Sequence, residues 1–456
     1  MKRKIPAYTQ EFRALFAIAW PTLIAQVAQM ATGVVDTVMA GHYSAVDLAA
    51  IAIGYNIWLP LYLVFIGVML GATTIIAQDY GAGRVQRIRA CLPQALWLAL
   101  LLGLVAGPLL YSAEPLLHLL DLAPQTHARS LGYLQATAFG LPAAALFQAL
   151  RCHTQGIGFM RPFALASVLG FLANIPLNYA LIYGKWGAPE LGAAGCGWAT
   201  AISMWLSPLL IGVYMLRARD LRPYLPDSLL VAPRLDILRD ILRLGTPMGL
   251  SFFLEVGVFS VIGLLIATLG DTVMAAHQIA YNVWDVTYIF LISVGSALAT
   301  RVGHAVGAGD SVAVQRAIAC GACATLLIGA VCSLVLLTGP GLIIAAFTGD
   351  ADIQRVAAAL VGLAALFIVI DAAQVTATFC LRAFKDTTFP FLVLCGTYWL
   401  LTLPLGYYWG MLRAEDGLAG ALGFWRAMIA GIALTSAVLL WRLYRTLQRP
   451  LSAPAT

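Results

Sequence analysis

The sequence carries little charge. Only 11% of its 456 residues are Asp, Glu, Lys or Arg, against about 25% in an ordinary soluble domain, and 61% are hydrophobic. This scarcity excludes a soluble globular protein. The apolar residues gather in twelve runs, each close to the roughly 20 residues that a membrane-spanning helix needs. The runs are 14–39, 50–76, 92–112, 130–150, 163–184, 193–215, 244–268, 276–300, 317–338, 355–381, 388–411 and 420–441.

A span in the membrane must satisfy its own backbone hydrogen bonds, so these runs predict helices. The short alternating segments of an outer-membrane barrel do not occur. The first run is too long for a cleavable signal, so we expect none. The sequence therefore predicts an all-α polytopic membrane protein with twelve transmembrane helices.

The sequence also lacks the motifs of a catalytic or metal centre. It contains no HExxH and no GxSxG, and its six His residues are scattered. Cys320 and Cys323 form a CGAC with no second half, so small apolar helix residues explain them better than a metal or redox site. We expect no resident cofactor and no enzyme, although an intramembrane enzyme and an uncoupled channel or receptor stay as weaker alternatives.

Basic residues are unevenly distributed between the predicted spans. If the N-terminus is cytoplasmic, only five of the 27 Lys and Arg residues lie on the outer side: Arg129, Lys185, Arg355, Arg413 and Arg426. That bias matches the positive-inside rule. It predicts a multi-pass protein of a bacterial inner membrane with both termini in the cytoplasm. The net charge of +6 then reflects this bias and attraction to membrane lipid rather than binding to nucleic acid.

The two halves of the chain repeat one another. A shift of 226 positions aligns Pro21 with Pro247, YNIW at 55–58 with YNVW at 281–284, and GAG at 81–83 with GAG at 307–309. The charged loop 216–243 separates six spans from six, which predicts an N-terminal lobe over 1–225 and a C-terminal lobe over 226–456. Six is even, so the repeats are parallel, an arrangement that places a binding site near the midplane between halves and permits alternating access.

Four acidic residues fall inside the apolar runs: Asp36, Glu255, Asp285 and Asp371. A carboxylate at the bilayer centre costs from about 2.5 kcal/mol upward, so it should face a cavity or a partner. Other residues share its helix face at successive steps of three or four positions, and the step between Gln29 and Asp36 passes through Gly33. The polar stripes are Gln26, Gln29 and Asp36; Asn174 and Asn178; Ser251 and Glu255; Gln278, Asn282 and Asp285; and Asp371, Gln374 and Thr378.

No Lys or Arg stands in the middle of a predicted span to pair with these acids. The carboxylates must therefore take up a proton, bind a cation or face water. Carboxylate and amide oxygens suit a hard cation such as Na+. An acidic cavity with aromatic walls also attracts an organic cation, and aromatic residues stand nearby: Tyr55, Trp58, Tyr281, Trp284 and Tyr288. Each residue also has a structural explanation, with Asp36 as a helix cap, Asp285 as part of a wet cleft, and the aromatics as packing.

Several segments identify the chain as similar to a known family. They are WPTLIAQVAQMATGVVDTVMAGHYSAVDLAAIAIG (20–54), IAQDYGAGR (76–84), NIPLNYALIYGKWGAPELGAAGCGWAT (174–200), GTPMGLSFFLEVGVFS (245–260) and VGAG (306–309). Over essentially its whole length, the chain resembles the multidrug and toxic compound extrusion (MATE) family, in its bacterial NorM-like branch. The resemblance implies a V-shaped pair of six-helix lobes that exports cationic and amphipathic organic compounds in exchange for H+ or Na+.

The resemblance also implies roles for individual residues. Glu255 and Asp371 match an acidic pair implicated in cation binding, including Na+, and Asp36 matches an aspartate implicated in coupling and drug binding. The resemblance makes Asn174 and Asn178 the polar neighbours of Asp36 and assigns drug contact to Asp36 and Asp350, with Gln278 similar. The polar stripes add Gln29, Asn282 and Asp285 as cavity neighbours, and the aromatic residues Tyr55, Tyr281 and Trp284 are the other predicted substrate contacts. Phe367 stands where some relatives carry a Tyr hydroxyl, so an identical Na+ site is not implied.

One alternative comes from the same broader superfamily, a flippase for lipid-linked or polysaccharide precursors. Such a cavity should be basic to hold pyrophosphate, and these spans carry acids instead. The sequence leaves the choice between H+ and Na+ open, since carboxylates bind both. It gives no reason to expect more than a monomer.

Overall fold

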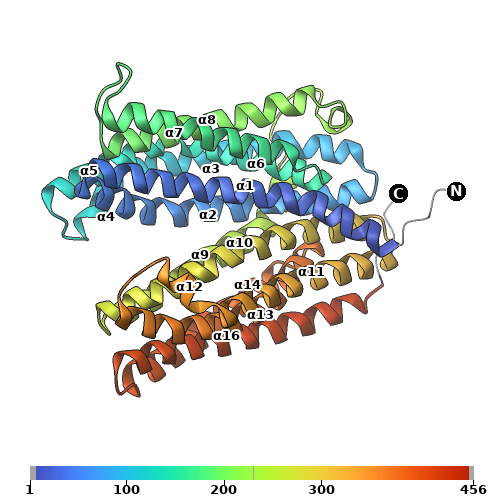
Figure 1. Cartoon of the computed structure of the whole chain (residues 1–456). Helices are drawn as coiled ribbons and strands as arrows, with labels where there is room; N and C mark the ends of the chain where they lie inside the picture. Colours follow the sequence, from blue (N-terminus) through green and yellow to red (C-terminus); the bar gives the residue numbers. More distant parts are fainter. Residues whose placement is uncertain (1–6, 230, 451–456) are drawn as a thin grey trace. The chain divides into compact units, whose positions relative to one another are not determined.

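The computed structural model describes residues 7–229 and 231–450 as α-helices joined by short connections (Figure 1). The chain divides into two compact units. One, called the N unit here, is Trp20–Gly249, and the other, called the C unit, joins the chain up to Ala19 with the part from Leu250 onward. The predicted lobe boundary at 225/226 concerns the sequence repeat and stays a prediction. By packing, the first turns of α1 belong with the C unit and the first turns of α9 with the N unit.

In the N unit, α7 packs on α8, α3 on α6, and α2 on both α5 and α6. Figure 1 shows α7 and α8 running side by side. The elements are α1 (Ala7–Tyr43, from Trp20), α2 (Ala45–Gly81), α3 (Val85–Tyr111), α4 (Glu114–His118), α5 (Pro124–Ala138), α6 (Leu141–Ile157), α7 (Arg161–Tyr183), α8 (Ala193–Arg217), a 3-10 turn (Arg222–Tyr224) and the start of α9 (Leu235–Ala267).

In the C unit, α13 is central and packs on α10, α11 and α16. Its buried residues Leu360, Ala364 and Ile368 lie in the core with Trp284 of α10 and Trp425 of α16. The elements are the rest of α9, α10 (Asp271–Gly307), α11 (Ser311–Thr338), α12 (Pro340–Ala345), α13 (Ala351–Ala383), α14 (Thr388–Leu394), α15 (Leu403–Tyr407), two π-helical segments (Cys395–Thr402 and Tyr408–Leu412) and α16 (Gly417–Leu447).

An ion pair holds the first turns of α1 in the C unit. Both carboxylate oxygens of Glu11 accept hydrogen bonds from the Arg301 guanidinium of α10, each at 2.7 Å. Glu11 is buried, with 7% of its surface exposed. A two-point pair of this kind fixes orientation as well as distance, so α1 is tied to the C unit at its start and enters the N unit from Trp20 onward.

Among the described residues, eleven helices are long and apolar enough to cross a membrane. The predicted span 130–150 is the exception, because its helix breaks between α5 and α6 at Phe139 and Gly140. Gly140 packs directly on α8: a Cβ there would lie 2.7 Å from the sulfur of Met204 and 2.9 Å from the Cα of Ala201. Pro142 then opens α6 without needing a backbone N–H.

The predicted span 388–411 is a second irregular region. It is a continuous winding over Thr388–Leu412, in which the π-helical segments flank the short α15. Pro404 has no N–H to donate to the carbonyl of Leu400, and this accounts for a departure from α-helical winding in the first of these segments. By contrast, α7 continues through Pro176 without a break.

The repeat detected in the sequence is visible in the turns. Gly83 follows α2 with φ +71° and Gly309 follows α10 with φ +69°. The two glycines are 226 positions apart, and each turns the chain into the third helix of its half. This left-handed conformation is easily adopted only by a residue without a Cβ. Matched glycines in matched conformations support a duplicated fold.

Two GxxxG motifs meet in the N unit. Gly67 and Gly71 of α2 lie against Gly249 and Gly245 of α9. At Gly245 an added Cβ would collide with the carbonyl group of Val68, and at Gly71 with the carbonyl oxygen of Ile241. Small residues four apart allow helix backbones to approach closely inside a membrane. The start of α9 is held on α2 in this way.

Gly245→Ala therefore tests the close crossing. The added methyl has no room, so we expect a loss of about 1–3 kcal/mol in unfolding free energy and a lower apparent melting temperature in detergent. Gly362→Ala in α13 is the matched control, because nothing lies within 4 Å of its added Cβ. Alanine should be neutral or stabilising there, since glycine is a poor helix former. Equal melting temperatures for both variants would contradict the crossing.

Candidate functional site

A buried carboxylate cluster lies in the N unit. Asp36 of α1 has only 6% of its surface exposed. The amide nitrogen of Asn178 in α7 donates to its Oδ1 at 2.6 Å, and the hydroxyl of Thr200 in α8 donates to its Oδ2 at 3.2 Å. The same Asn178 nitrogen also reaches Oδ1 of Asn174 at 2.9 Å. Three helices thus converge on one carboxylate, with neutral donors on both oxygens.

The sequence predicted Asn174 and Asn178 as neighbours of Asp36, and the structure brings the three together. It adds Thr200 and Cys196 of α8, which also lie against Asp36. Both Asn174 and Asn178 are fully buried. The Asn178 Oδ1 accepts no hydrogen bond from the described part of the chain. A buried amide oxygen beside a carboxylate is the kind of group that a proton donor or a cation would satisfy.

A second cluster lies in the C unit around Asp371 of α13. This residue is 2% exposed, and its Oδ2 accepts a hydrogen bond from the indole nitrogen of Trp284 at 3.1 Å. Gln374, one turn further along α13, accepts at 3.2 Å from the hydroxyl of Tyr398. Tyr398 lies in the first π-helical segment. The next residue, Trp399, donates to the carbonyl of Leu254 at 3.2 Å, beside Glu255.

Glu255 of α9 belongs to the same cluster. It interacts electrostatically with Asp371, Tyr288 and Tyr398, and also with Arg382 near the end of α13. No ion pair within 4 Å involves Asp36, Glu255 or Asp371 in residues 7–229 and 231–450. Asp371 is therefore held by the indole dipole of Trp284, and Arg382 acts on Glu255 from beyond 4 Å.

Two buried arginines lie just beyond predicted span ends, and no pattern in the sequence indicated their burial. Arg382 is 7% exposed and lies over the rings of Phe252 and Phe379, at 5.2 and 4.6 Å. Arg151 of α6 is 6% exposed and lies 4.4 Å over the ring of Phe163. The predicted spans end at 150 and 381, one residue before each. The helices continue to Ile157 and Ala383 and carry both arginines into the protein.

Matched aromatic residues line the second helix of each half. Trp58 of α2 contacts Tyr55 edge-on and Tyr62 at a tilt, with ring centroids 5.6 and 5.3 Å apart. In α10, Trp284 contacts Tyr281 at a tilt and stacks with Tyr288, at 5.3 and 5.2 Å. Each pair of counterparts is 226 positions apart.

Trp58 and Trp284 differ in the hydrogen-bond acceptor of their indole N–H. Trp58 donates to the hydroxyl of Tyr133 at 3.3 Å, and Trp284 donates to the carboxylate of Asp371. The structure thus places Trp284, predicted as a substrate contact, as a buried support for Asp371. Tyr55 is 40% exposed and is the more accessible of the predicted aromatic contacts.

The remaining predicted site residues form no hydrogen bond with Asp36, Glu255 or Asp371 in the described part of the chain. Gln278 donates to Asn282 at 3.0 Å on α10, and Asp285 is half-buried on the same helix. Gln29 is half-buried on α1, and its position in the repeat is that of Glu255. Asp350 is exposed and caps α13, accepting from the backbone N–H groups of Asp352 and Ile353. It lies about 30 Å along the helix axis from Asp371.

Together these features define a polytopic α-helical membrane protein of two repeats, with buried carboxylates inside its helices. Comparison with known proteins agrees. The MatE family model matches residues 21–180 and 247–408, one match to each half. The chain is 38% identical to the multidrug resistance protein PmpM of Pseudomonas aeruginosa, over 96% of this chain and 92% of that one. It is also 38% identical to the multidrug resistance protein NorM of Vibrio cholerae, over 96% of both chains. The chain belongs to the multidrug and toxic compound extrusion (MATE) family.

Solved structures agree on the fold. An outward-facing multidrug resistance MATE family transporter of the MOP superfamily matches with a TM-score of 0.86 at 19% identity, over 98% of this chain and 99% of that one. The eukaryotic MATE transporter AtDTX14 matches with a TM-score of 0.85 at 17% identity, over 97% of this chain and 99% of that one. The chain therefore has the MATE fold throughout its length.

Trp284→Phe tests the support of Asp371, because it keeps an aromatic ring and removes the donor. If Asp371 is ionised we expect a loss of about 1.5–3 kcal/mol in unfolding free energy, and about 0.5–1.5 kcal/mol if it is neutral. Trp58→Phe is the matched control, since it removes the neutral bond to Tyr133. Melting in detergent is measured for each variant and in an Asp371→Leu background. The effect of Trp284→Phe should shrink in that background, and an unchanged effect would show that the bond does not exist.

Proposed function

We propose that this protein is a multidrug efflux antiporter that expels cationic and amphipathic organic compounds by alternating access, in exchange for H+ or Na+. Family membership and the names of relatives such as PmpM and NorM support the efflux of drugs. One observation carries the coupling: the carboxylates of Asp36, Glu255 and Asp371 stand inside apolar helices, and no ion pair within 4 Å neutralises them among the described residues.

A carboxylate in such a place needs a positive partner for much of the time. A proton, Na+ and an organic cation can each supply the charge, so they compete. Binding of one must weaken binding of the others, and this reciprocity is the thermodynamic basis of exchange. The direction of the cycle then depends on which conformation each ligand prefers.

The two clusters are built for exchange rather than for permanent neutralisation. In the N unit, neutral donors hold both oxygens of Asp36, so its orientation is kept when an ion leaves. In the C unit, Trp284 holds Oδ2 of Asp371, and the exchangeable ion takes Oδ1. Glu255 is the second carboxylate there, and Arg382 moderates its charge at longer range when the ion is absent.

The same proposal includes a topology and a location. The Lys and Arg bias places both termini in the cytoplasm of a bacterial inner membrane. Substrates then enter from the cytosol or the inner leaflet and leave on the outer side. We propose that the transporter works as a monomer, with membrane lipid as its surroundings and no nucleic-acid partner.

Neutral variants of the three acids test the coupling. Asp36→Asn, Glu255→Gln and Asp371→Asn remove the exchangeable charge and keep the side-chain size. Each should lower ethidium efflux from pump-deficient cells by at least about fivefold at equal expression, as expected when a coupling energy of 1–3 kcal/mol is lost.

Asp310→Asn is the matched control, because Asp310 caps the start of α11 and asparagine caps equally well. Its efflux should stay within about twofold of the wild type. Wild-type efflux in all three acid variants would contradict the proposed coupling and return the flippase hypothesis to consideration.

A further inference from the structure

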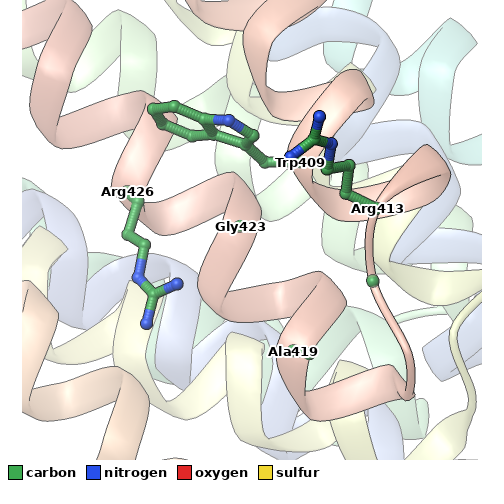
Figure 2. Close-up of a pocket in the computed structure, with 6 residues that line it drawn as sticks. Trp409, Arg413, Ala419, Gly423 and Arg426 are labelled. Atoms are coloured by element: carbon green, nitrogen blue, oxygen red, sulfur yellow. The ribbon is translucent and has the colours of Figure 1, made fainter.

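A basic pocket lies at the end of the C unit where the second π-helical segment leads into α16. Its volume is about 380 Å³, and its walls are Trp409, Arg413, Ala414, Ala419, Gly423 and Arg426. Figure 2 shows Trp409 and Arg413 coming from one segment and Arg426 from the neighbouring helix, with Gly423 between them. The volume is near the lower limit of about 300 Å³ for small-molecule sites, so a compact charged group fits better than a large drug.

Both arginines in this pocket lack an acidic partner in the described part of the chain. Of the five basic residues predicted on the outer side, Arg129 pairs with Asp47 and Arg355 pairs with Asp352. Arg413 and Arg426 form no ion pair within residues 7–229 and 231–450. The guanidinium of Arg413 lies over the ring of Tyr408, at 5.2 Å.

The acids nearest in sequence do not line the pocket. Glu415 and Asp416 lie in the turn before α16. One carboxylate oxygen of Asp416 is taken by the backbone N–H of Ala419, at 2.6 Å, as the helix cap. Two exposed guanidinium groups therefore share one pocket that holds no carboxylate.

The depth of Arg426 points to the membrane surface. It lies nine residues into α16, about 14 Å along the helix axis. The helix is 31 residues long, or about 46 Å, so if it is centred on a hydrocarbon core of about 30 Å it enters the core after about 8 Å. The Cα of Arg426 is then slightly below the boundary, and its guanidinium reaches the headgroup layer. Trp409 stands beside it, as tryptophans do at this level.

The helix crossing at this pocket does not require Trp409 and Arg426. A shift of 228 positions places Gly195 on Gly423, and both glycines close the same helix crossing. A Cβ on Gly195 would meet the backbone of Leu181, and one on Gly423 would meet the backbone of Trp409. Leu181 and Trp409 are themselves 228 apart, and Trp198 is the counterpart of Arg426. The N unit thus makes this crossing with Leu and Trp where the C unit has Trp and Arg.

Exposed apolar side chains lie on the same stretch of chain as the pocket residues. Leu412, next to Arg413, is 66% exposed in the second π-helical segment, and Leu400 is 78% exposed in the first. A ligand with a phosphate and an attached hydrocarbon chain can contact both the arginines and the exposed leucines. A free anion contacts only the arginines. From this arrangement we propose that the pocket binds the phosphate of an anionic phospholipid headgroup, such as phosphatidylglycerol, through Arg413 and Arg426. Under the proposed topology the lipid belongs to the outer leaflet.

Native mass spectrometry of the purified protein tests the site without any transport reaction. Phosphatidylglycerol and phosphatidylcholine are titrated separately into the wild type and into Arg413→Gln/Arg426→Gln. The wild type should bind phosphatidylglycerol about tenfold or more tightly than phosphatidylcholine, as two interfacial arginines imply, and the double variant should lose this preference.

The matched control is Arg355→Gln/Arg445→Gln. It removes the same charge and includes Arg445, which lies 5.4 Å over Trp441 near the other end of α16. This control should keep the preference. Arg413→Lys/Arg426→Lys should keep part of it, because the charge stays and the forked donors are lost. The Lys variant keeps the test valid if the Gln variant does not fold.

Competition with inorganic phosphate distinguishes a phospholipid headgroup from a free oxyanion as the ligand. If millimolar phosphate leaves bound phosphatidylglycerol in place, the lipid is the ligand. If phosphate displaces it and binds in its absence, the same arginines form a site for a free oxyanion and the lipid assignment is wrong. Equal retention of phosphatidylglycerol by the wild type and Arg413→Gln/Arg426→Gln would overturn the site itself.

Discussion

The burial of carboxylates among apolar helices is the constraint on which the rest of this structure depends. An acid at the centre of a bilayer costs from about 2.5 kcal/mol upward, and more if it has no partner. The protein retains three such acids, and amide, hydroxyl and indole donors from neighbouring helices bond to two of them, Asp36 and Asp371. A lysine or arginine in direct contact would have neutralised them permanently. Neutral donors orient the carboxylates and leave their charge available to a mobile ion.

The two repeats share a scaffold and differ in their chemistry. The GAG turns and the aromatic clusters of α2 and α10 are duplicated. The acids are not. The 226-residue shift places Ile262 at the position of Asp36 and Gln29 at the position of Glu255, and the 228-residue shift places Met428 at the position of Thr200. One repeat thus carries a single carboxylate among amides, and the other carries a carboxylate pair with an indole and a longer-range arginine. Two unlike sites can bind different ions or the same ion at different stages of a cycle.

Apolarity along the sequence predicted the helices well, because a membrane span is defined by the length and apolarity of its run. It could not place the break at Gly140, since close contact with Met204 and Ala201 depends on helices distant in sequence. A proline such as Pro404 indicates only that a helix is interrupted, and the sequence does not reveal the two π-helical segments that the structure has there. Thr200 was missed because a lone hydroxyl in an apolar helix gives no periodic signal, and Arg382 because its span was predicted to end one residue early. The hydrogen bond from Trp284 to Asp371 could not be predicted either, since the spacing of residues places an aromatic ring on a helix face but does not identify the acceptor of its N–H.

The central claim is that an ion gradient drives transport through the buried acids, and reconstitution tests it most directly. Purified protein in liposomes is given ethidium and an imposed pH gradient without Na+, and separately a Na+ gradient at equal pH. The account predicts that at least one gradient drives ethidium uphill in the wild type. In the combined Asp36→Asn/Glu255→Gln/Asp371→Asn variant neither gradient should do so. Uphill transport by that variant at the wild-type rate, or none by the wild type under either gradient, would contradict the account.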